Sequence, residues 1–215
     1  MKNVETDESK GLGGRKDRLR ATILSAGQTI FLANGFSGTS MDDVARAAGV
    51  SKQTVYAHLQ SKEQLFLAVI DAMSGGAGDL LADTTSDPTH QKSFATYLRH
   101  FARQQLTIVL TPSLTQLRRI VIAEVGRFPE LGQMLYNRGP GRSIERLTRD
   151  FTHYQDKRQM RATDARQAAS LFNWLVMGQP VNDAMLLGDD ALPSEDKIAT
   201  HADVCVRIFL AAFGV

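Results

Sequence analysis

The feature that most constrains this fold is a run of closely spaced helix start and stop signals between residues 39 and 64. Ser40 and Asp43 have the spacing of a capping box, which satisfies free backbone amides at the start of a helix. Gly49 can adopt the left-handed conformation that ends many helices, and Ser51 can cap the next helix. Another start signal follows at Ser61. The pattern predicts short helices over residues 40–48 and 51–59 and a third helix beginning at residue 61.

Helical periodicity also dominates the rest of the sequence. From Asp17 to Phe31 apolar residues recur three or four positions apart, and Asn34 with Gly35 provides a stop signal. Residues 74–90 are expected to form a loop or a broken helix end. Further helices, separated by breaks at proline and glycine, are expected over residues 91–110, 113–127, 129–137, 142–156, 164–187 and 194–213. No segment alternates with a period of two residues and no repeat is found, so the sequence predicts an all-α protein.

Composition limits the class of protein. Of the 215 residues, 43% are hydrophobic and 22% are charged, which provides enough apolar surface for a folded core. The N-terminus is polar, and no apolar run approaches the roughly 18 residues that a membrane span needs. We therefore expect neither a membrane-spanning nor a secreted protein, and the cytoplasm is the expected compartment. The single cysteine, Cys205, excludes an intramolecular disulfide.

Charge is distributed unevenly along the chain. The net charge is only +2, but between Lys10 and Lys62 eight basic residues stand against three acidic ones. The remainder of the chain is therefore net negative. A basic N-terminal quarter indicates that a polyanion contacts that end of the molecule.

The two short helices at residues 40–59 have the spacing of a helix-turn-helix. Gly49 permits the sharp turn, and Val55 is expected to pack back on the first helix. The other side chains of the second helix can reach phosphates and base edges in a DNA major groove. They are Ser51, Lys52, Gln53, Thr54, Tyr56 and His58. The alternative is a capped hairpin that serves only as structure, as in a helical protein-interaction module without specific DNA binding.

The segment TSMDDVARAAGVSKQTVYAHLQSKEQLFLAVI resembles the DNA-binding domain of the TetR family of transcriptional regulators. The resemblance covers about residues 17–70 and includes Val-Ala-x-x-Ala-Gly-Val-Ser, Tyr-x-His-Leu and Ser-Lys-Glu-x-Leu. It implies that residues 51–59 are the recognition helix and that Ser40 and Lys62 contact phosphates of a pseudo-palindromic, double-stranded operator. Many members carry a second aromatic residue after the tyrosine and a phenylalanine after the histidine. Ala57 and Leu59 stand there in this chain, so the resemblance implies no operator sequence.

A second resemblance concerns residues 120–140, which look like the regulatory domain of a TetR subgroup often linked to efflux control. It implies a homodimer, more often a repressor than an activator, that is released from DNA by a small hydrophobic or aromatic effector. The expected organisation is a flexible arm at residues 1–14, a helix-turn-helix domain at 15–62, and a helical ligand-binding and dimerisation domain at 63–215.

Residues can be suggested for both roles of the larger domain. In the family the last two helices pair with their copies, and the small and apolar candidates for that seam are Ala168, Leu171, Leu175, Ala202, Cys205 and Phe209. Candidates for the effector pocket are Phe66, Met73, Phe101, Leu106 and Trp174, with Glu124 and Arg127 as polar anchors. Burial within the core of one subunit is the alternative for both sets, because pockets and cores share an apolar composition.

No catalytic or metal-binding pattern is found in the sequence. Ser194 and Lys197 have Ser-x-x-Lys spacing, but the companion motifs of that serine chemistry are missing. The five histidines show no paired ligand spacing such as His-Glu-x-x-His. We therefore expect no enzyme, no metal and no cofactor, and we expect Cys205 to be a buried and inert thiol.

Overall fold

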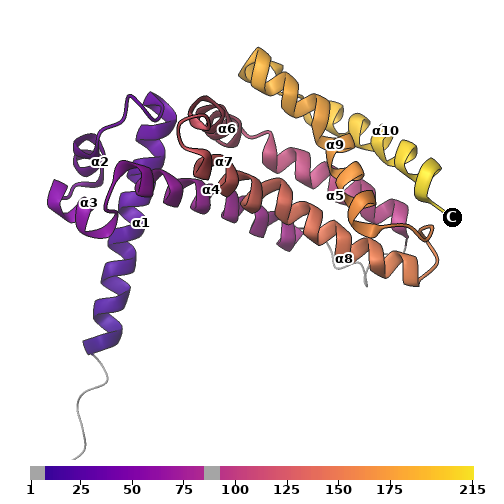
Figure 1. Cartoon of the computed structure of the whole chain (residues 1–215), viewed down its shortest axis with the longest axis horizontal. Coiled ribbons are helices and arrows are strands. Elements are labelled where there is room, and N and C mark those ends of the chain that lie inside the picture. Colours follow the sequence, from indigo (N-terminus) through magenta and orange to yellow (C-terminus); the bar gives the residue numbers. More distant parts are fainter. Residues whose placement is uncertain (1–7, 85–92) are drawn as a thin grey trace, which may run out of the picture. The chain divides into compact units, whose positions relative to one another are not determined.

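Helices make up nearly all of the regular structure in the computed structural model, which describes the backbone of residues 8–84 and 93–215 and the side chains of residues 14–81 and 93–215 (Figure 1). The α-helices of the described residues are α1 (Glu8–Asn34), α2 (Met41–Ala48), α3 (Lys52–His58), α4 (Lys62–Thr84), α5 (Phe94–Val109), α6 (Pro112–Glu124), α7 (Pro129–Tyr136), α8 (Arg142–Asp156), α9 (Ala165–Leu187) and α10 (Glu195–Phe213). A π-helical turn, η1 (Asn137–Gly141), joins α7 to α8, and a 3-10 turn, η2 (Asp189–Ala191), follows α9. The all-α prediction is confirmed.

The residues up to Ile70 form one compact unit, which contains α1, α2, α3 and the first part of α4. Its core is centred on Phe66 of α4. The centroid of that ring lies 4.6 Å from the ring of Phe31 and 5.3 Å from the ring of Phe36. Because the start of α4 belongs to this core, the boundary between the units falls after Ile70 and not at the predicted position after residue 62.

The second unit comprises Asp71–Val215. Within it α8 packs against α9, and α10 packs against α5 and α9. The core contains a cluster of aromatic rings, in which the centroid of Phe209 on α10 lies 4.9 Å from Phe172 on α9 and 5.4 Å from Phe151 on α8. Aromatic pairs of this kind contribute about 0.5–1.5 kcal/mol each beyond their buried area, so they fix how these three helices meet.

The first helix is longer than predicted. It begins at Glu8 and not at Asp17, so residues 8–14 are helical and are not part of a flexible arm. The first seven residues of the predicted arm lie outside the described residues. The glycines of this segment each disfavour helix by about 1 kcal/mol, but a nucleated helix gains one hydrogen bond for every residue that is added. The nucleus lies further along, where Ile23 and Phe31 are fully buried.

The predicted loop at residues 74–90 is helical as far as Thr84, and the remainder of that segment lies outside the described residues. The glycines that suggested a break are a place of close packing. A Cβ atom on Gly78 would lie only 2.8 Å from Nη1 of Arg142, whose guanidinium donates to the carbonyl oxygen of Gly75 at 3.3 Å. Glycine therefore lets an arginine of α8 lie directly across α4.

The predicted break around Pro140 is the π-helical turn η1, through which the helix continues into α8. A π turn holds one more residue than an α turn and is found mostly as a single turn inside an α-helix. Pro140 has no amide hydrogen, so it cannot donate within a regular α-helical ladder. Gly141 lies in a tight place, because a Cβ atom there would lie 3.0 Å from the carbonyl oxygen of Tyr136.

Candidate functional site

The predicted helix-turn-helix is present in the first unit, and its local chemistry explains the turn. Ser40 accepts a hydrogen bond from the amide of Asp43, and the Asp43 carboxylate accepts from the Ser40 amide, which completes the capping box of α2. Gly49 ends α2 with φ of 67°, a left-handed conformation that favours glycine. Ser51 then caps α3 by accepting from the amide of Thr54 at 3.1 Å. Each short helix is therefore capped at its N-terminus by a side chain.

The predicted DNA-contact residues of α3 lie on its solvent side. Val55 is fully buried beneath them, as the sequence predicted. Tyr56 is exposed over 42% of its surface, so its phenol ring is accessible to a partner. Ser51, Lys52 and Gln53 are exposed, and Thr54 and His58 are half-buried. The helix thus presents one continuous face of hydroxyl, amide, ammonium, phenol and imidazole groups.

Two residues predicted to contact phosphate already have roles within the unit. The Ser40 hydroxyl donates to the Asp43 carboxylate at 2.6 Å, and this bond holds the pKa of Asp43 below its usual value. The Lys62 ammonium donates to the carbonyl oxygens of Phe36 at 2.9 Å and Thr39 at 3.0 Å, and it lies 4.5 Å from the centroid of the Phe36 ring. Lys62 therefore fastens the turn between α1 and α2 to the start of α4.

Lys52 is held less firmly. Its ammonium donates to Asp42 on α2 at 2.8 Å, and both side chains are 54% exposed. The hydrogen bond from Lys52 to Asp42 raises the pKa of Lys52, so the lysine stays charged at neutral pH. An exposed ion pair of this kind contributes only about 0–1 kcal/mol, so Lys52 can exchange Asp42 for a phosphate at little cost.

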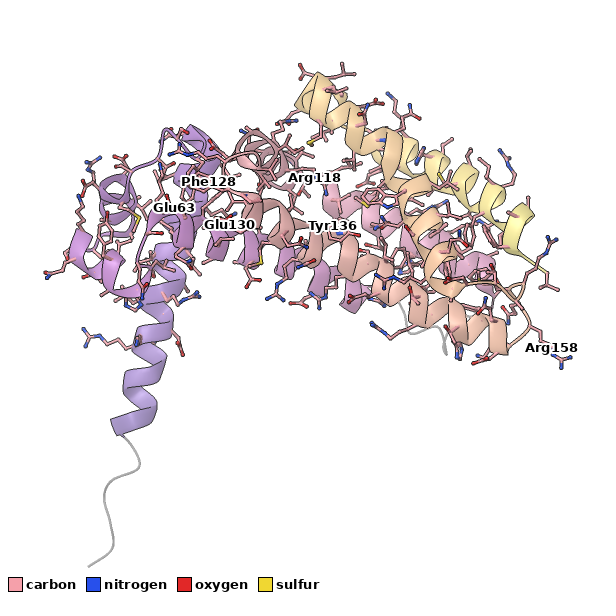
Figure 2. The ribbon with its side chains drawn as sticks, viewed as in Figure 1. Glu63, Arg118, Phe128, Glu130, Tyr136 and Arg158 are labelled. Atoms are coloured by element: carbon pink, nitrogen blue, oxygen red, sulfur yellow. The ribbon has the colours of Figure 1, made fainter. Side chains whose placement is uncertain are left out.

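The second unit contains a cavity of about 450 Å³ between α4, α5, α6, α7, η1, α8 and α9. Its apolar lining consists of Ala77, Leu81, Ile108, Val109, Leu114, Leu135, Pro140 and Met177, together with Gly78 and Gly139. Its polar lining consists of Ser74, Gln105, Arg118, Arg138, Arg142, Ser143, Arg146, Arg149 and Asp150. Arg118, which is labelled in Figure 2, comes from α6. The volume lies within the range of about 300–1,000 Å³ that is usual for small-molecule sites.

None of the seven predicted pocket residues lines this cavity. Phe66 belongs to the core of the first unit, while Phe101 and Leu106 are fully buried in the core of the second. Trp174 is 47% exposed on α9. The others are Met73 and Glu124, which are half-buried, and Arg127, which is exposed beside Phe128.

These side chains do not face this cavity because the prediction identified helices and not their faces. Helices α4, α5, α6 and α9 do line the cavity, but from neighbouring positions. On α9 the lining residue is Met177, three positions after Trp174, and on α5 Gln105, next to Leu106, lines the cavity together with Ile108 and Val109. The prediction did not include the lining residues of α7, η1 and α8.

Most residues of the predicted dimer seam are buried within a single chain. Ala168, Ala202, Cys205 and Phe209 are at most 2% exposed within a single chain, because they face the core of their own subunit. Leu171 is 53% exposed and Leu175 is half-buried, so these two remain on or near the surface. The predicted seam did not include the exposed apolar residues Trp174, Leu186, Leu187, Val204 and Ile208 of these helices. Leu171 and Trp174 on α9, and Val204 and Ile208 on α10, are three or four residues apart and therefore lie on one side of their helix.

Cys205 is buried as predicted, with its thiol 3.4 Å from the carbonyl oxygen of Leu175. Burial raises the pKa of this thiol, which keeps it protonated. Among the described side chains of residues 14–81 and 93–215, no three His, Cys, Asp or Glu side chains are grouped so that they could hold a metal ion. No single described helix is long and apolar enough to cross a membrane, although α5 and α6, bent by 69° at their junction, meet that test as a pair.

Two family models match the chain. Residues 23–69 match the family described as "Bacterial regulatory proteins, tetR family". Residues 96–215, which are more than half of the chain, match "AefR-like transcriptional repressor, C-terminal domain". The two matches fall on the two units of the structure.

Solved structures resemble the chain over nearly its whole length. One is a TetR-family transcriptional regulator from Mesorhizobium loti, with 31% identity, coverage of 94% of this chain and 99% of the other, and a TM-score of 0.88. Another is the flavonoid-responsive regulator FrrA, with 33% identity, coverage of 92% and 98%, and a TM-score of 0.75.

The chain is similar to curated proteins over shorter regions. The chain is 36% identical over 76 residues to FasR of Mycolicibacterium smegmatis, an HTH-type transcriptional activator. The match covers 34% of this chain and 35% of FasR, so the chain spans about a third of the length of that relative.

Proposed function

Because the chain belongs to the TetR family and is a DNA-binding transcriptional regulator, not an enzyme, we propose that it acts as a homodimeric repressor which a small effector releases from its operator. The observation that supports DNA binding is the exposed polar face of α3. This helix and α2, which lies on the other side of the turn, are each capped at the N-terminus by a serine side chain. Its partner would be chromosomal DNA, and its compartment therefore the cytoplasm.

In this proposal α3 lies in the major groove and the α2 start faces the DNA backbone. Tyr56, Gln53 and Thr54 read base edges, while Lys52 contacts phosphate. The basic residues near the start of α1 add attraction that does not depend on sequence; Arg15, Lys16, Arg18 and Arg20 are all exposed.

The experiment that tests DNA binding starts from genomic fragments retained by the purified protein, which are sequenced to find an operator. Binding to that operator is then measured by fluorescence anisotropy over a range of salt concentrations. Lys52→Ala should weaken binding to the operator and to unrelated duplexes alike. It should also reduce the slope of log K against log salt by about 1. Lys157→Ala, an exposed lysine of the second unit, is the matched control and should leave the slope unchanged. Equal slopes for all three proteins would contradict a phosphate contact at Lys52.

We base the homodimer on the exposed apolar residues of α9 and α10. Leu171, Trp174, Val204 and Ile208 are between 37% and 53% exposed in the single chain, and a second copy would cover them. A dimer also supplies two recognition helices for half-sites about 34–36 Å apart, which one short helix cannot read alone.

Sedimentation of a double variant tests this interface. Leu171→Glu with Ile208→Glu should give a folded monomer, because two charges per chain would be buried without partners. Ile122→Glu, at a side chain that is 56% exposed on α6, is the control and should leave the dimer intact. A double variant that stays dimeric would place the interface elsewhere.

The proposal that an effector releases the protein from DNA rests on the cavity of the second unit and on the name of FrrA, which describes that relative as flavonoid-responsive. An effector shifts DNA binding only by its differential affinity for the two states, and about 1.4 kcal/mol of coupling gives a tenfold change. Transcription from a reporter carrying the operator would decide the sign of regulation. Higher expression without the protein supports a repressor, and lower expression supports an activator.

A further inference from the structure

The lining of the cavity in the second unit combines two kinds of side chain. The aliphatic residues, which we call the aliphatic wall, come from several helices and include Leu81, Ile108, Leu114 and Met177. Five arginines also line the cavity, four from η1 and α8 and the fifth, Arg118, from α6, whereas Asp150 is the one acidic side chain among the described lining residues. A lining that is both apolar and cationic suits a molecule that has an apolar body and a negative end.

Three of the five arginines are occupied by groups of the protein. Arg138 forms an ion pair with Asp71, and Arg142 donates to Asp79 at 2.5 Å. Arg146 donates to the carbonyl oxygen of Leu81 at 3.2 Å and lies 3.6 Å from Asp150. Arg149 is exposed to solvent. These four raise the positive potential of the cavity but are not the groups that most need a ligand.

Arg118 differs from the others, because its Nη1 atom is buried and has no hydrogen-bond partner. Burial lowers the pKa of its guanidinium below the usual value, since a charged group loses hydration there. An arginine side chain nevertheless stays protonated in proteins. The residue as a whole is half-buried, so the free protein keeps a charged group at the cavity wall with one buried N–H donor that has no protein partner.

Two further buried polar atoms without partners lie on the same cavity. They are Oγ of Ser74 on α4, a residue 4% exposed, and Oε1 of Gln105 on α5, a residue 1% exposed. Gln105 donates through Nε2 to Oδ1 of Asn173 at 2.8 Å. Both amides can turn over without losing this bond, so Gln105 can present either an oxygen or an N–H to a ligand.

We propose that this cavity binds an amphipathic organic anion, whose carboxylate accepts hydrogen bonds from Arg118 and Ser74 while its apolar body lies against the aliphatic wall. The inference rests on the proposed effector site and specifies its ligand class. A small inorganic anion would leave the aliphatic wall without contacts. A neutral apolar molecule would leave three buried polar atoms unpaired, which disfavours binding.

The experiment compares two probes of matched shape, 2-naphthoate and 2-naphthamide, by isothermal titration calorimetry on the full chain without DNA. The acid should bind at least tenfold more tightly than the amide to the wild-type protein. In Arg118→Met the affinity for the acid should fall at least tenfold, while the affinity for the amide changes less than threefold. Arg118→Gln provides a second, polar replacement with the same expected loss.

The matched control is Arg119→Met, one residue along α6. Arg119 does not line the cavity, and its guanidinium donates to Asp189 at 2.7 Å and to the carbonyl oxygen of Ala184 at 2.8 Å. This variant should keep the preference for the acid but melt at a lower temperature. Arg118→Met should melt at a higher temperature than the wild type, because it removes a buried N–H donor that has no partner. A residue with a merely structural role would not give that rise.

Equal binding of the acid and the amide, no detectable binding of the acid, or an unchanged preference in both Arg118 variants would each overturn the proposal. These results would not contradict the proposed role as a DNA-binding regulator, because operator binding is measured separately. Conversely, a chain that binds no operator but prefers the acid would contradict the proposed function and support this ligand class.

Discussion

Replacing Lys62 by alanine should destabilise the first unit far more than the same change at Lys52. The Lys62 ammonium donates to two carbonyl oxygens, at 2.9 and 3.0 Å, and lies over the Phe36 ring. Without it, the carbonyl groups of Phe36 and Thr39 lose their charged donor in a partly buried place. Lys52 has one exposed partner, Asp42.

The expected losses of stability differ between the two variants. A hydrogen bond to a charged group contributes about 1.5–3 kcal/mol, and a cation–π contact at an exposed site about 0.5–1 kcal/mol. Because Lys62 is half-buried and water can replace part of what is lost, we expect Lys62→Ala to cost about 2–3 kcal/mol. An exposed ion pair contributes about 0–1 kcal/mol, which is the limit for Lys52→Ala.

Hydrogen exchange measured by mass spectrometry can follow the first unit by itself. Since about 1.4 kcal/mol corresponds to a tenfold change, amides in residues 31–45 should exchange roughly thirtyfold to a hundredfold faster in Lys62→Ala. The corresponding change in Lys52→Ala should be no more than about fivefold. Equal acceleration in the two variants would refute the assignment of Lys62 as a fastener of the turn between α1 and α2.

Three further outcomes are expected. Ser40→Ala should lower the stability of the first unit by about 0.5–2 kcal/mol, measured by the same exchange experiment, because it removes the cap of α2. The Asp43 carboxyl should titrate below 3.8 when followed by NMR, so the contribution of the capping box is present above that pKa and is lost as the pH falls through the lower folded value. Cys205 should react with a thiol reagent only in denaturant, because its thiol is buried and protonated; rapid reaction of the native protein would contradict that burial.

The helix-turn-helix could be predicted closely because its determinants are local. The cap at Ser40, the left-handed Gly49 and the cap at Ser51 act over three or four residues and do not depend on the rest of the fold. The predicted helices at residues 40–48 and 51–59 therefore agree with α2 and α3 to within one residue at every end.

The cavity and the exposed seam could not be predicted in the same way, since they depend on which face of each helix meets its neighbours. Ile208 and Phe209 are adjacent and both apolar, yet the first is 52% exposed and the second 2%. Gly78 illustrates the same limit, because a glycine that breaks a helix and a glycine that admits an arginine from another helix look alike in sequence. The packing partner decides between them.

The π turn at residues 137–141 gives this junction one residue more than an α-helical turn would hold. Because the turn takes up that residue locally, loss of one residue there would leave a regular α-helix whose flanking residues keep their faces. Loss of one residue inside α8 would instead rotate one part of that helix against the other by about 100°. The buried stripe of α8, which includes Phe151, would then compete with its arginines for the same direction. A single-codon deletion inside α8 should therefore do more damage than the same deletion in the turn.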